Sequence, residues 1–275
     1  MIKKILSILW TLIAFCGLTI LTQIGGLVYL FSILLNQKWN KEKSSGLRFA
    51  GIFICLYLAT TFILTPPLAS ILGRKSLPKS NSGLVIPNHW LTCLLNRHYV
   101  KPEMYKLIFE SAEKLNENRK IKLKIRYLDA NFPFINGFPL LPHRSHDNGE
   151  KLDIAFLYMD KENHLFWNKR ISVLGYGNCE VPQKGEINTP QECKRKGYWQ
   201  YSLLQKIASE ESLSEVYFDG YANGALIKTL SDHPSTSKIF IEPHLKHRLG
   251  FSNDAKIRFH GCAAVRHDDH IHIEL

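Results

Sequence analysis

The segment HDDHIHIEL, residues 267–275, decides the fold of the C-terminal part because its last residues alternate in character. Successive side chains of a β-strand face opposite sides of the sheet. Ile271 and Ile273 therefore lie on one side, while His270 and His272 lie on the other. We predict a strand here, with an apolar face that packs on a core and a polar face that carries two imidazoles.

A second histidine-containing segment, HRSHDNGEKLD, spans residues 143–153. His146 and Asp153 lie seven residues apart, and Gly149 between them allows a tight turn that brings them together. Asp153 also precedes the apolar run IAFLY, which predicts a buried strand. We therefore expect the carboxylate to lie at the start of a rigid strand.

The residue types in the two segments are those of a zinc site. Neutral imidazole and carboxylate are common zinc ligands, and a catalytic zinc takes three protein groups and leaves a fourth position for water. We predict His146, Asp153 and His272 as the ligands and His270 as the group for acid–base work. A lone His-X-His or His-X6-Asp has little specificity, and the metal prediction rests on their occurrence together.

The two segments together resemble the penicillin-insensitive murein endopeptidases. This family belongs to a wider group that contains lysostaphin, the D-alanyl-D-alanine metallopeptidases and the Hedgehog signalling domain. The group pattern His-X2-Gly-X-(Ala/Asp)-X-Asp corresponds to His146, Gly149, Lys151 and Asp153, and its terminal His-X-His to residues 270–272. The segment KIFIEPHLK, residues 238–246, also resembles the strand and helix before the last motif, so the likeness covers scattered blocks of residues 120–275.

This resemblance implies a Zn2+-dependent hydrolase that cuts peptide bonds in peptidoglycan. It implies that His270 acts as the base, and that His143 and His267 orient groups or stabilise the oxyanion. Two residues depart from the family, because Lys151 replaces a small or acidic residue and Glu274 replaces a basic one. Glu274 is either a group that orients His272 or a solvated terminal residue.

Two other functions are compatible with the same motifs. One is a D,D-carboxypeptidase of the same fold that trims terminal D-alanine. The other is a non-catalytic, zinc-stabilised membrane module that binds murein or a protein partner. An imidazole at position 270 that is not needed as a ligand favours an enzyme, because a purely structural site gains nothing from it.

The N-terminal part has the composition of a membrane anchor. Residues 5–35 and 49–72 are almost entirely apolar, and about 20 apolar residues suffice for a helix to cross a bilayer. The first stretch is too long for the apolar region of a signal peptide. We therefore predict a two-helix anchor over residues 1–75, followed by a zinc metallopeptidase-like domain over residues 76–275.

The charges around the anchor bear on its orientation. The loop between the two apolar stretches carries a single acidic residue, Glu42, and four basic residues: Lys38, Lys41, Lys43 and Arg48. An excess of positive charge favours the cytoplasmic side. Together with a murein substrate, this implies a two-pass protein of a bacterial inner membrane whose C-terminal domain lies on the periplasmic or external side.

The rest of the chain predicts an α+β domain. Helical spacing is found over residues 102–115 and 198–209. Strands are expected at 123–127, near 216, around 239 and over 256–259, and the Phe-Pro-rich segment 131–139 is expected to pack in the core or to line a groove.

Charge and cysteines give weaker indications. The net charge of +11 comes from dispersed lysines and arginines without a nucleic-acid-binding motif. It indicates either membrane lipid and murein carboxylates as partners or a basic surface that is simply solvated, and not nucleic acid. An exported domain permits disulfides. Cys179 and Cys193 are one plausible pair, although sequence does not determine connectivity.

Overall fold

The structure, a computed structural model, describes residues 2–39, 46–167, 169–172, 174–203 and 215–275. Its centre is a mixed six-stranded sheet with the order β2-β4-β5-β10-β8-β9. The fold is thus mixed α and β, as predicted. The strands of this sheet are β2 (Val85–Pro87), β4 (Ile125–Tyr127), β5 (Lys151–Ala155), β8 (Lys238–Phe240), β9 (Ile257–Arg258) and β10 (His270–Glu274).

The terminal strand β10 lies inside the sheet, between β5 and β8. Both neighbours run antiparallel to it, and the register places His272 opposite Asp153. Ile271 and Ile273 are fully buried in the core. The alternation predicted from the sequence is therefore confirmed, and the two imidazoles of β10 face away from this core.

Two helices, α6 (Pro102–Asn116) and α9 (Gly220–Asp232), pack together against the apolar face of the sheet. Pro102 at the first turn begins α6 as predicted, and Ile108, Ala112 and Leu115 lie in the core. Helix α9 was not predicted, because two glycines and an asparagine in its first turns lower helix propensity. The side chain of Asp219 caps its N-terminus by accepting from the backbone N–H of Ala222.

Several boundaries differ from those expected. β5 begins at Lys151, so Asp153 lies in the middle of the strand rather than at its start. Of the helix predicted over 198–209, the described helical part is α8 (Gln200–Leu203); residues 198–199 precede it and are not helical, and residues 204–209 lie outside the described residues. The other elements are α5 (Trp90–Leu94), α7 (Thr189–Arg195), α10 (Pro243–Arg248), β1 (Lys75–Ser76) paired with β3 (Tyr99–Val100), and β6 (Tyr158–Asp160) paired with β7 (Val216–Phe218).

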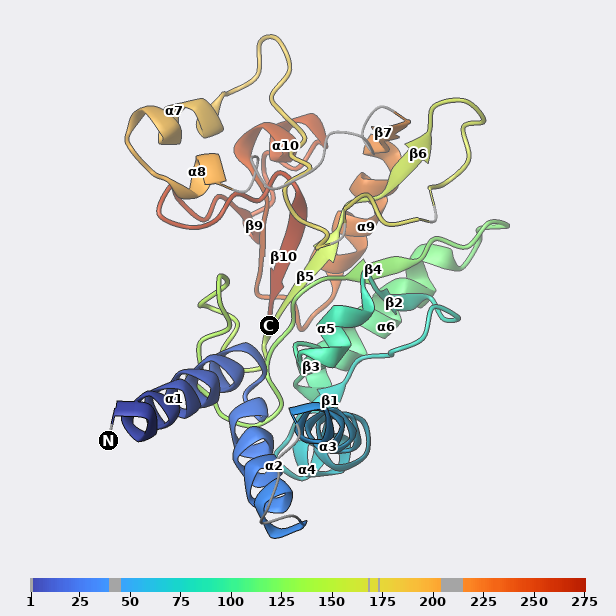
Figure 1. The fold of residues 1–275 in the computed structure, drawn as a ribbon. Helices are drawn as coiled ribbons and strands as arrows, with labels where there is room; N and C mark the ends of the chain where they lie inside the picture. The colour runs from blue at the N-terminus through green and yellow to red at the C-terminus, as the bar shows by residue number, and fades with distance from the viewer. Residues whose placement is uncertain (1, 40–45, 168, 173, 204–214) are drawn as a thin grey trace.

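The N-terminal helices gather at one end of the molecule (Figure 1). The first apolar stretch forms two helices rather than one, because the chain turns at Gln23, whose φ of 68° is left-handed. Two helices, Ile2–Thr22 and Gly46–Ile71, are long and apolar enough to span a membrane. The helices of this part are α1 (Ile2–Thr22), α2 (Gly25–Trp39), α3 (Gly46–Ala59), the π-helix η1 (Thr60–Leu64) and α4 (Thr65–Ile71).

The N-terminal helices contact the C-terminal part of the chain through specific polar groups. The side-chain oxygen of Gln23 accepts from the backbone N–H of Phe134 at 2.9 Å, and the hydroxyl of Tyr57 donates to the carbonyl of Leu94 at 2.8 Å. Phe134 also packs on the small apolar cluster of Ile24, Val28 and Tyr57 in these helices. Of the two roles considered for the segment 131–139, Phe134 therefore has that of packing.

We expect Ile273→Ala to lower the free energy of unfolding by about 2–5 kcal/mol, because a fully buried side chain is replaced by a cavity. The measurement is the unfolding transition of the full chain in detergent micelles. Ile121→Ala is the matched control, since Ile121 is 53% exposed and its truncation should change little. Equal effects of the two substitutions would contradict the assignment of β10 to the core.

Candidate metal centre

The predicted site residues meet on the polar face of the sheet. Asp153 lies on β5, while His270 and His272 lie on the neighbouring β10. His143 and His146 come from the loop between β4 and β5 and are buried, with 4% and 1% exposure. The loop leads directly into β5, whereas His272 lies 119 residues after Asp153, and the pairing of β10 with β5 brings the two parts together.

Gly149 forms the tight turn that was predicted between His146 and Asp153. Gly149 adopts a left-handed φ of +84°, which an L side chain rarely adopts. A Cβ at this position would also lie 1.2 Å from Nη1 of Arg74, the buried arginine that follows α4. The same guanidinium donates to the side chain of Asn136. The turn between the first histidines and Asp153 is therefore packed against the residue that closely follows the N-terminal helices.

Three donor atoms form a compact group. The distance from His146 Nε2 to Asp153 Oδ1 is 3.2 Å, and His272 Nδ1 lies 3.1 Å from the former atom and 2.8 Å from the latter. Donors about 2.0–2.1 Å from a tetrahedral zinc lie roughly 3.3 Å from one another. The separations are thus close to those of a zinc ligand set.

The hydrogen bonds around the two imidazoles leave the correct nitrogens available. His146 Nδ1 donates to the carbonyl of Ala130 at 2.7 Å, which leaves the Nε2 lone pair directed to the centre. His272 Nε2 lies 3.3 Å from Oε1 of Glu274, which leaves Nδ1 for the centre. Such outer contacts are typical of metal-binding histidines. Glu274 thus orients His272, one of the two roles considered for it from the sequence.

His143 contacts the other oxygen of the same carboxylate. Its Nδ1 lies 2.7 Å from Asp153 Oδ2, and the hydroxyl of Tyr176 donates to that oxygen at 2.8 Å. His143, His146 and Asp153 form a buried group that could hold a metal ion, since one ligand atom of each lies within 4.8 Å of the others. Tyr176 was missed by sequence reasoning, because nothing in its local sequence indicates a contact with Asp153.

The ring of His270 is held at one nitrogen, while its other nitrogen has no hydrogen-bond partner among the described residues. Its Nδ1 lies 2.5 Å from Oδ1 of Asp269, while its Nε2 lies 3.7 Å from Asp153 Oδ1. Nε2 is buried and has no hydrogen-bond partner among the described residues. The carboxylate of Asp269 therefore fixes the ring and leaves one nitrogen directed to the centre.

The electrostatics of the site follow from burial and from its charges. Burial raises the pKa of Asp153, but the neighbouring His146, His270 and His143 outweigh it and hold the pKa well below its usual range. Burial lowers the pKa of His270, and the carboxylates of Asp153 and Asp269 reverse this and raise it to about 9. Without a metal ion the buried carboxylate is thus neutralised by imidazolium.

His267 is placed beside this group by contacts of its backbone. Its ring centroid lies 4.9 Å from that of His270, and its backbone N–H donates to the carboxylate of Glu242 at 3.4 Å. Burial holds the pKa of His267 well below its usual range, so the ring is neutral. The structure thus brings all six predicted site residues together, and their individual roles stay predictions.

The group opens into a cavity of about 600 Å³. His260, which the sequence analysis did not single out, also lies on this wall, and its ring stacks on Phe240 with centroids 4.3 Å apart. Lys151 is not among the lining residues, because its ammonium group donates to Asn148 at 3.2 Å. The apolar part of the wall consists of Pro142, Leu174, Trp199, Ala263, Ala264 and Val265.

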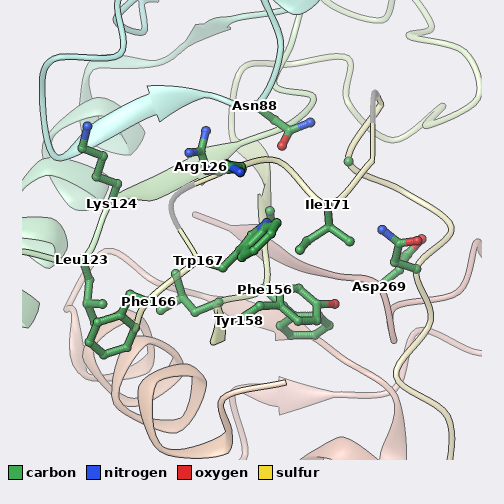
Figure 2. A pocket seen from close by; sticks show the side chains of 15 residues that line it. Asn88, Leu123, Lys124, Arg126, Phe156, Tyr158, Phe166, Trp167, Ile171 and Asp269 are labelled. Carbon is green, nitrogen blue, oxygen red and sulfur yellow. The ribbon is translucent and has the colours of Figure 1, made fainter. Parts of the chain in front are cut away.

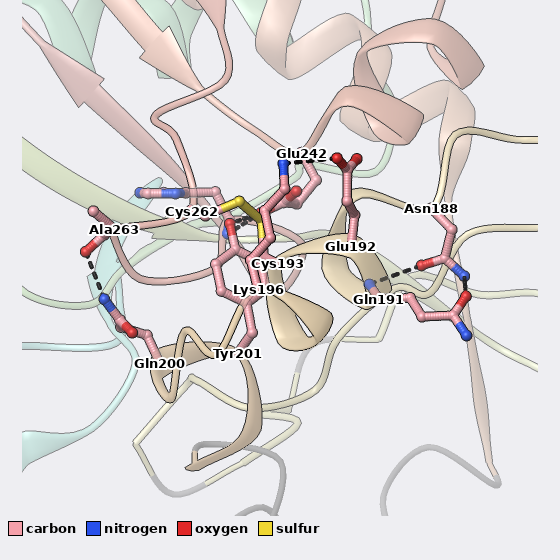
Figure 3. The surroundings of a disulfide bond; sticks show 11 residues. Asn188, Gln191, Glu192, Cys193, Lys196, Gln200, Tyr201, Glu242, Cys262 and Ala263 are labelled. Carbon is pink, nitrogen blue, oxygen red and sulfur yellow. Dashed lines mark hydrogen bonds and ion pairs between the residues drawn. A yellow bond between two sulfur atoms is a disulfide. The ribbon is translucent and has the colours of Figure 1, made fainter.

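A disulfide joins two parts of the cavity wall. Cys193 in α7 pairs with Cys262, just before the lining residues 263–265 (Figure 3). The side chain of Gln200 donates to the carbonyl of Ala263 at 2.7 Å beside it. The suggested pair of Cys179 with Cys193 is therefore wrong, and Cys179 is free and half-buried. The partner of Cys193 is distant in sequence, so local spacing could not indicate it.

Comparison with known proteins does not assign the chain to a family. No known family matches its sequence, and no curated protein is significantly similar to it. The interpretation of the site therefore rests on its own geometry and on the motifs in the sequence.

We expect the full chain, purified in detergent, to bind about one zinc ion, and we expect His146→Ala or Asp153→Ala to abolish this binding, because each removes a donor from the buried group. Elemental analysis after gel filtration is the measurement. His247→Ala, which alters an exposed histidine of α10, is the control and should retain the metal. A well-folded wild-type protein that binds no zinc under any loading condition would refute the metal centre.

The stability of the protein is expected to depend on pH through Glu242, which is not one of the predicted metal ligands. Its side chain is fully buried, and one carboxylate oxygen accepts a hydrogen bond from the hydroxyl of Tyr201 at 3.0 Å (Figure 3). The other oxygen has no partner among the described residues. Burial and the nearby Asp268 raise the pKa of Glu242 from 4.5 to about 7. The folded state therefore binds the proton more tightly than the unfolded state, and stability falls as pH rises from 4.5 to 7.

We therefore expect Glu242→Gln to gain stability relative to wild type by roughly 3 kcal/mol as the pH rises from 4.5 to 8, because the amide avoids a buried charge. Thermal unfolding at several pH values measures the difference. Glu113→Gln, on the exposed side of α6, is the control and should unfold at the same temperature as wild type at every pH. A constant difference between Glu242→Gln and wild type would show that the carboxyl does not titrate in this range.

Proposed function

We propose that the protein is a zinc metallopeptidase that hydrolyses peptide bonds in peptidoglycan. The observation that carries the proposal is the free Nε2 of His270, buried beside a compact group of two imidazoles and one carboxylate. A structural zinc site saturates its metal with protein ligands, whereas a catalytic site keeps a position open and places a base next to it. The arrangement favours the catalytic alternative.

The ligand set proposed is His146, Asp153 and His272. A zinc ion held there supplies Lewis-acid chemistry, which polarises a carbonyl oxygen and makes a water molecule acidic enough to ionise near neutral pH. His143 and Tyr176 hold the second oxygen of Asp153 and so keep the first oxygen directed to the centre. Glu274 and the carbonyl of Ala130 orient the two imidazoles.

The proton steps fall to His270. Its Nδ1–H is held by Asp269, so the ring presents an unprotonated Nε2 once the positive charge of a metal ion replaces that of the imidazolium. Nε2 accepts the proton of the attacking water and then delivers it to the leaving amine. His267, held neutral by burial, lies against this ring and is proposed to stabilise the developing oxyanion as a donor.

The peptidoglycan substrate is inferred from the resemblance of residues 143–153 and 267–275 to the murein endopeptidases. A cavity of about 600 Å³ at the centre is large enough for several residues of a peptide. The disulfide in its wall is compatible with an oxidising compartment. We therefore propose a periplasmic or external domain that is held at a bacterial inner membrane by the N-terminal helices.

We expect His270→Ala to keep zinc and to lose about 100-fold or more in turnover, because a general base contributes on that scale. We expect His272→Ala to lose both zinc and activity, because it removes a ligand. Zinc quantification and digestion of murein sacculi, with products resolved by mass spectrometry, are run on both variants. His247→Ala serves again as the surface control.

Two outcomes would contradict these roles. Loss of zinc in His270→Ala, or full activity of that variant, would mean that His270 is a ligand or a bystander. A wild-type protein that carries zinc but cleaves neither sacculi nor peptides containing D-amino acids would instead favour a module that binds without catalysis.

The proposed location has its own test. A reporter that is active only outside the cytoplasm should be active when fused after Leu275 and silent when inserted after Lys43, because positive loops stay in the cytoplasm. Fusions are made in the full chain, and a reporter that is active only inside the cytoplasm provides the reciprocal control. The reverse pattern would place the domain in the cytoplasm and exclude murein as the substrate.

A further inference from the structure

A second, smaller pocket lies on the same face of the sheet as the metal centre (Figure 2). Ala155 lines it, and Asp153 lies two residues earlier on the same side of β5, about 7 Å along the strand. The hydroxyl of Tyr176 reaches Asp153, while Gly175 and Asn178 line the small pocket. The segment 175–178 therefore separates the two cavities.

Arg126 supplies an unused positive charge to this pocket. It lies on β4, with its neighbours Ile125 and Tyr127 turned into the core. Its guanidinium forms no hydrogen bond or ion pair with any residue that the structure describes, although burial lowers its pKa. A guanidinium that is partly removed from water is stabilised by an anionic partner, because the partner compensates the lost hydration.

The pocket also contains polar groups that lack partners. Asn178 is 4% exposed, and neither its amide nitrogen nor its carbonyl oxygen has a partner among the described residues. The indole nitrogen of Trp167 is likewise buried without an acceptor. Buried polar groups without partners are rare in folded proteins and indicate a ligand or ordered water. Figure 2 shows Arg126 and Trp167 at one side of the pocket and Asp269 at the other.

Among the described lining residues, the one acidic group does not neutralise Arg126. Asp269 accepts from the backbone N–H of Gly177 at 2.5 Å and holds Nδ1 of His270 at 2.5 Å, so each of its oxygens is engaged. The other charged lining residues, Lys124 and Lys169, are basic. The pocket thus has an excess of positive charge and of unpaired donors.

We propose that this pocket binds the free carboxylate end of a peptide-like molecule, with Arg126 as its ion-pair partner. The planar guanidinium matches a carboxylate with two parallel hydrogen bonds. The donor and acceptor of Asn178 match the N–H and C=O of the adjoining peptide group. The space in the pocket is about 30 Å³, room for about two or three water-sized groups, so the planar carboxylate end enters it and the rest of the molecule extends outside. Inorganic phosphate has no peptide group for Asn178 and is therefore expected to bind less well.

This site is separate from the proposed hydrolysis, and its test does not need activity. The probe is N-acetylglycine, compared with the neutral N-acetylglycinamide, with acetate and with inorganic phosphate. Binding to the zinc-loaded full chain in detergent is followed by ligand-observed NMR. We expect the wild type to prefer N-acetylglycine over the amide by about tenfold or more, the scale of a charge-assisted hydrogen bond, and to bind phosphate no better than the amide.

Substitutions test whether the preference for N-acetylglycine over the amide arises in this pocket. Arg126→Gln should abolish it, and Arg126→Lys, which keeps the charge and most of the packing, should reduce it several-fold. Asn178→Ala should weaken N-acetylglycine but leave acetate unchanged, because acetate has no peptide group. Arg258→Gln, the same charge change at an exposed arginine of β9, is the control. Circular dichroism and retained zinc establish that each variant is folded.

Three results would overturn the proposal. The wild type could bind the acid and the amide equally, which would mean that the pocket holds ordered water only. Arg126→Lys and Arg126→Gln could keep the full preference, which would place the carboxylate elsewhere. Binding of the acid could also disappear in His272→Ala and persist in the Arg126 variants, which would assign it to the metal centre instead.

Discussion

The pairing of Asp153 with His272 across β5 and β10 is the contact on which the site depends. A carboxylate with no exposed surface is costly to bury unless its charge is compensated. Here Oδ1 faces His146 and His272, while Oδ2 faces His143 and Tyr176. The register of two central strands therefore determines where the charge lies, and the loop before β5 can then add its two imidazoles.

The N-terminal helices are connected to the site by direct contacts. Arg74 follows α4 and packs against Gly149, so it contacts the turn that aligns His146 with Asp153. Gln23 at the bend between α1 and α2 holds the backbone of Phe134 in the loop that leads to His143. The position of the candidate metal centre relative to the apolar helices is thus set by direct contacts and not by a free linker.

The predictions from sequence succeeded where the pattern was local. The alternation at 270–274 showed which side of the strand is buried, because a period of two reflects the geometry of the strand itself. Helix α6 was found from its Pro at the first turn and from its apolar spacing. Helix α9 was missed, since its glycines argue against a helix and its stability comes from packing on α6. The pairing of Cys193 was wrong because the partner, Cys262, lies 69 residues away in sequence.

The sequence by itself determined which chemical groups are available to this protein. They are imidazoles and a carboxylate in two short segments, a strand with one apolar face, and two apolar stretches in the N-terminal part. Only the tertiary structure decided which atoms meet. The contacts of Tyr176 with Asp153 and of Arg74 with Gly149 join residues that are separated in the chain. Asp269 and His270 are neighbours in sequence, but only the structure shows that the carboxylate faces Nδ1 of the ring, and that Arg126 lines a pocket without an ion-pair partner among the described residues. Side-chain identity is a local property, whereas proximity arises from strand register and packing, which no short window of sequence contains.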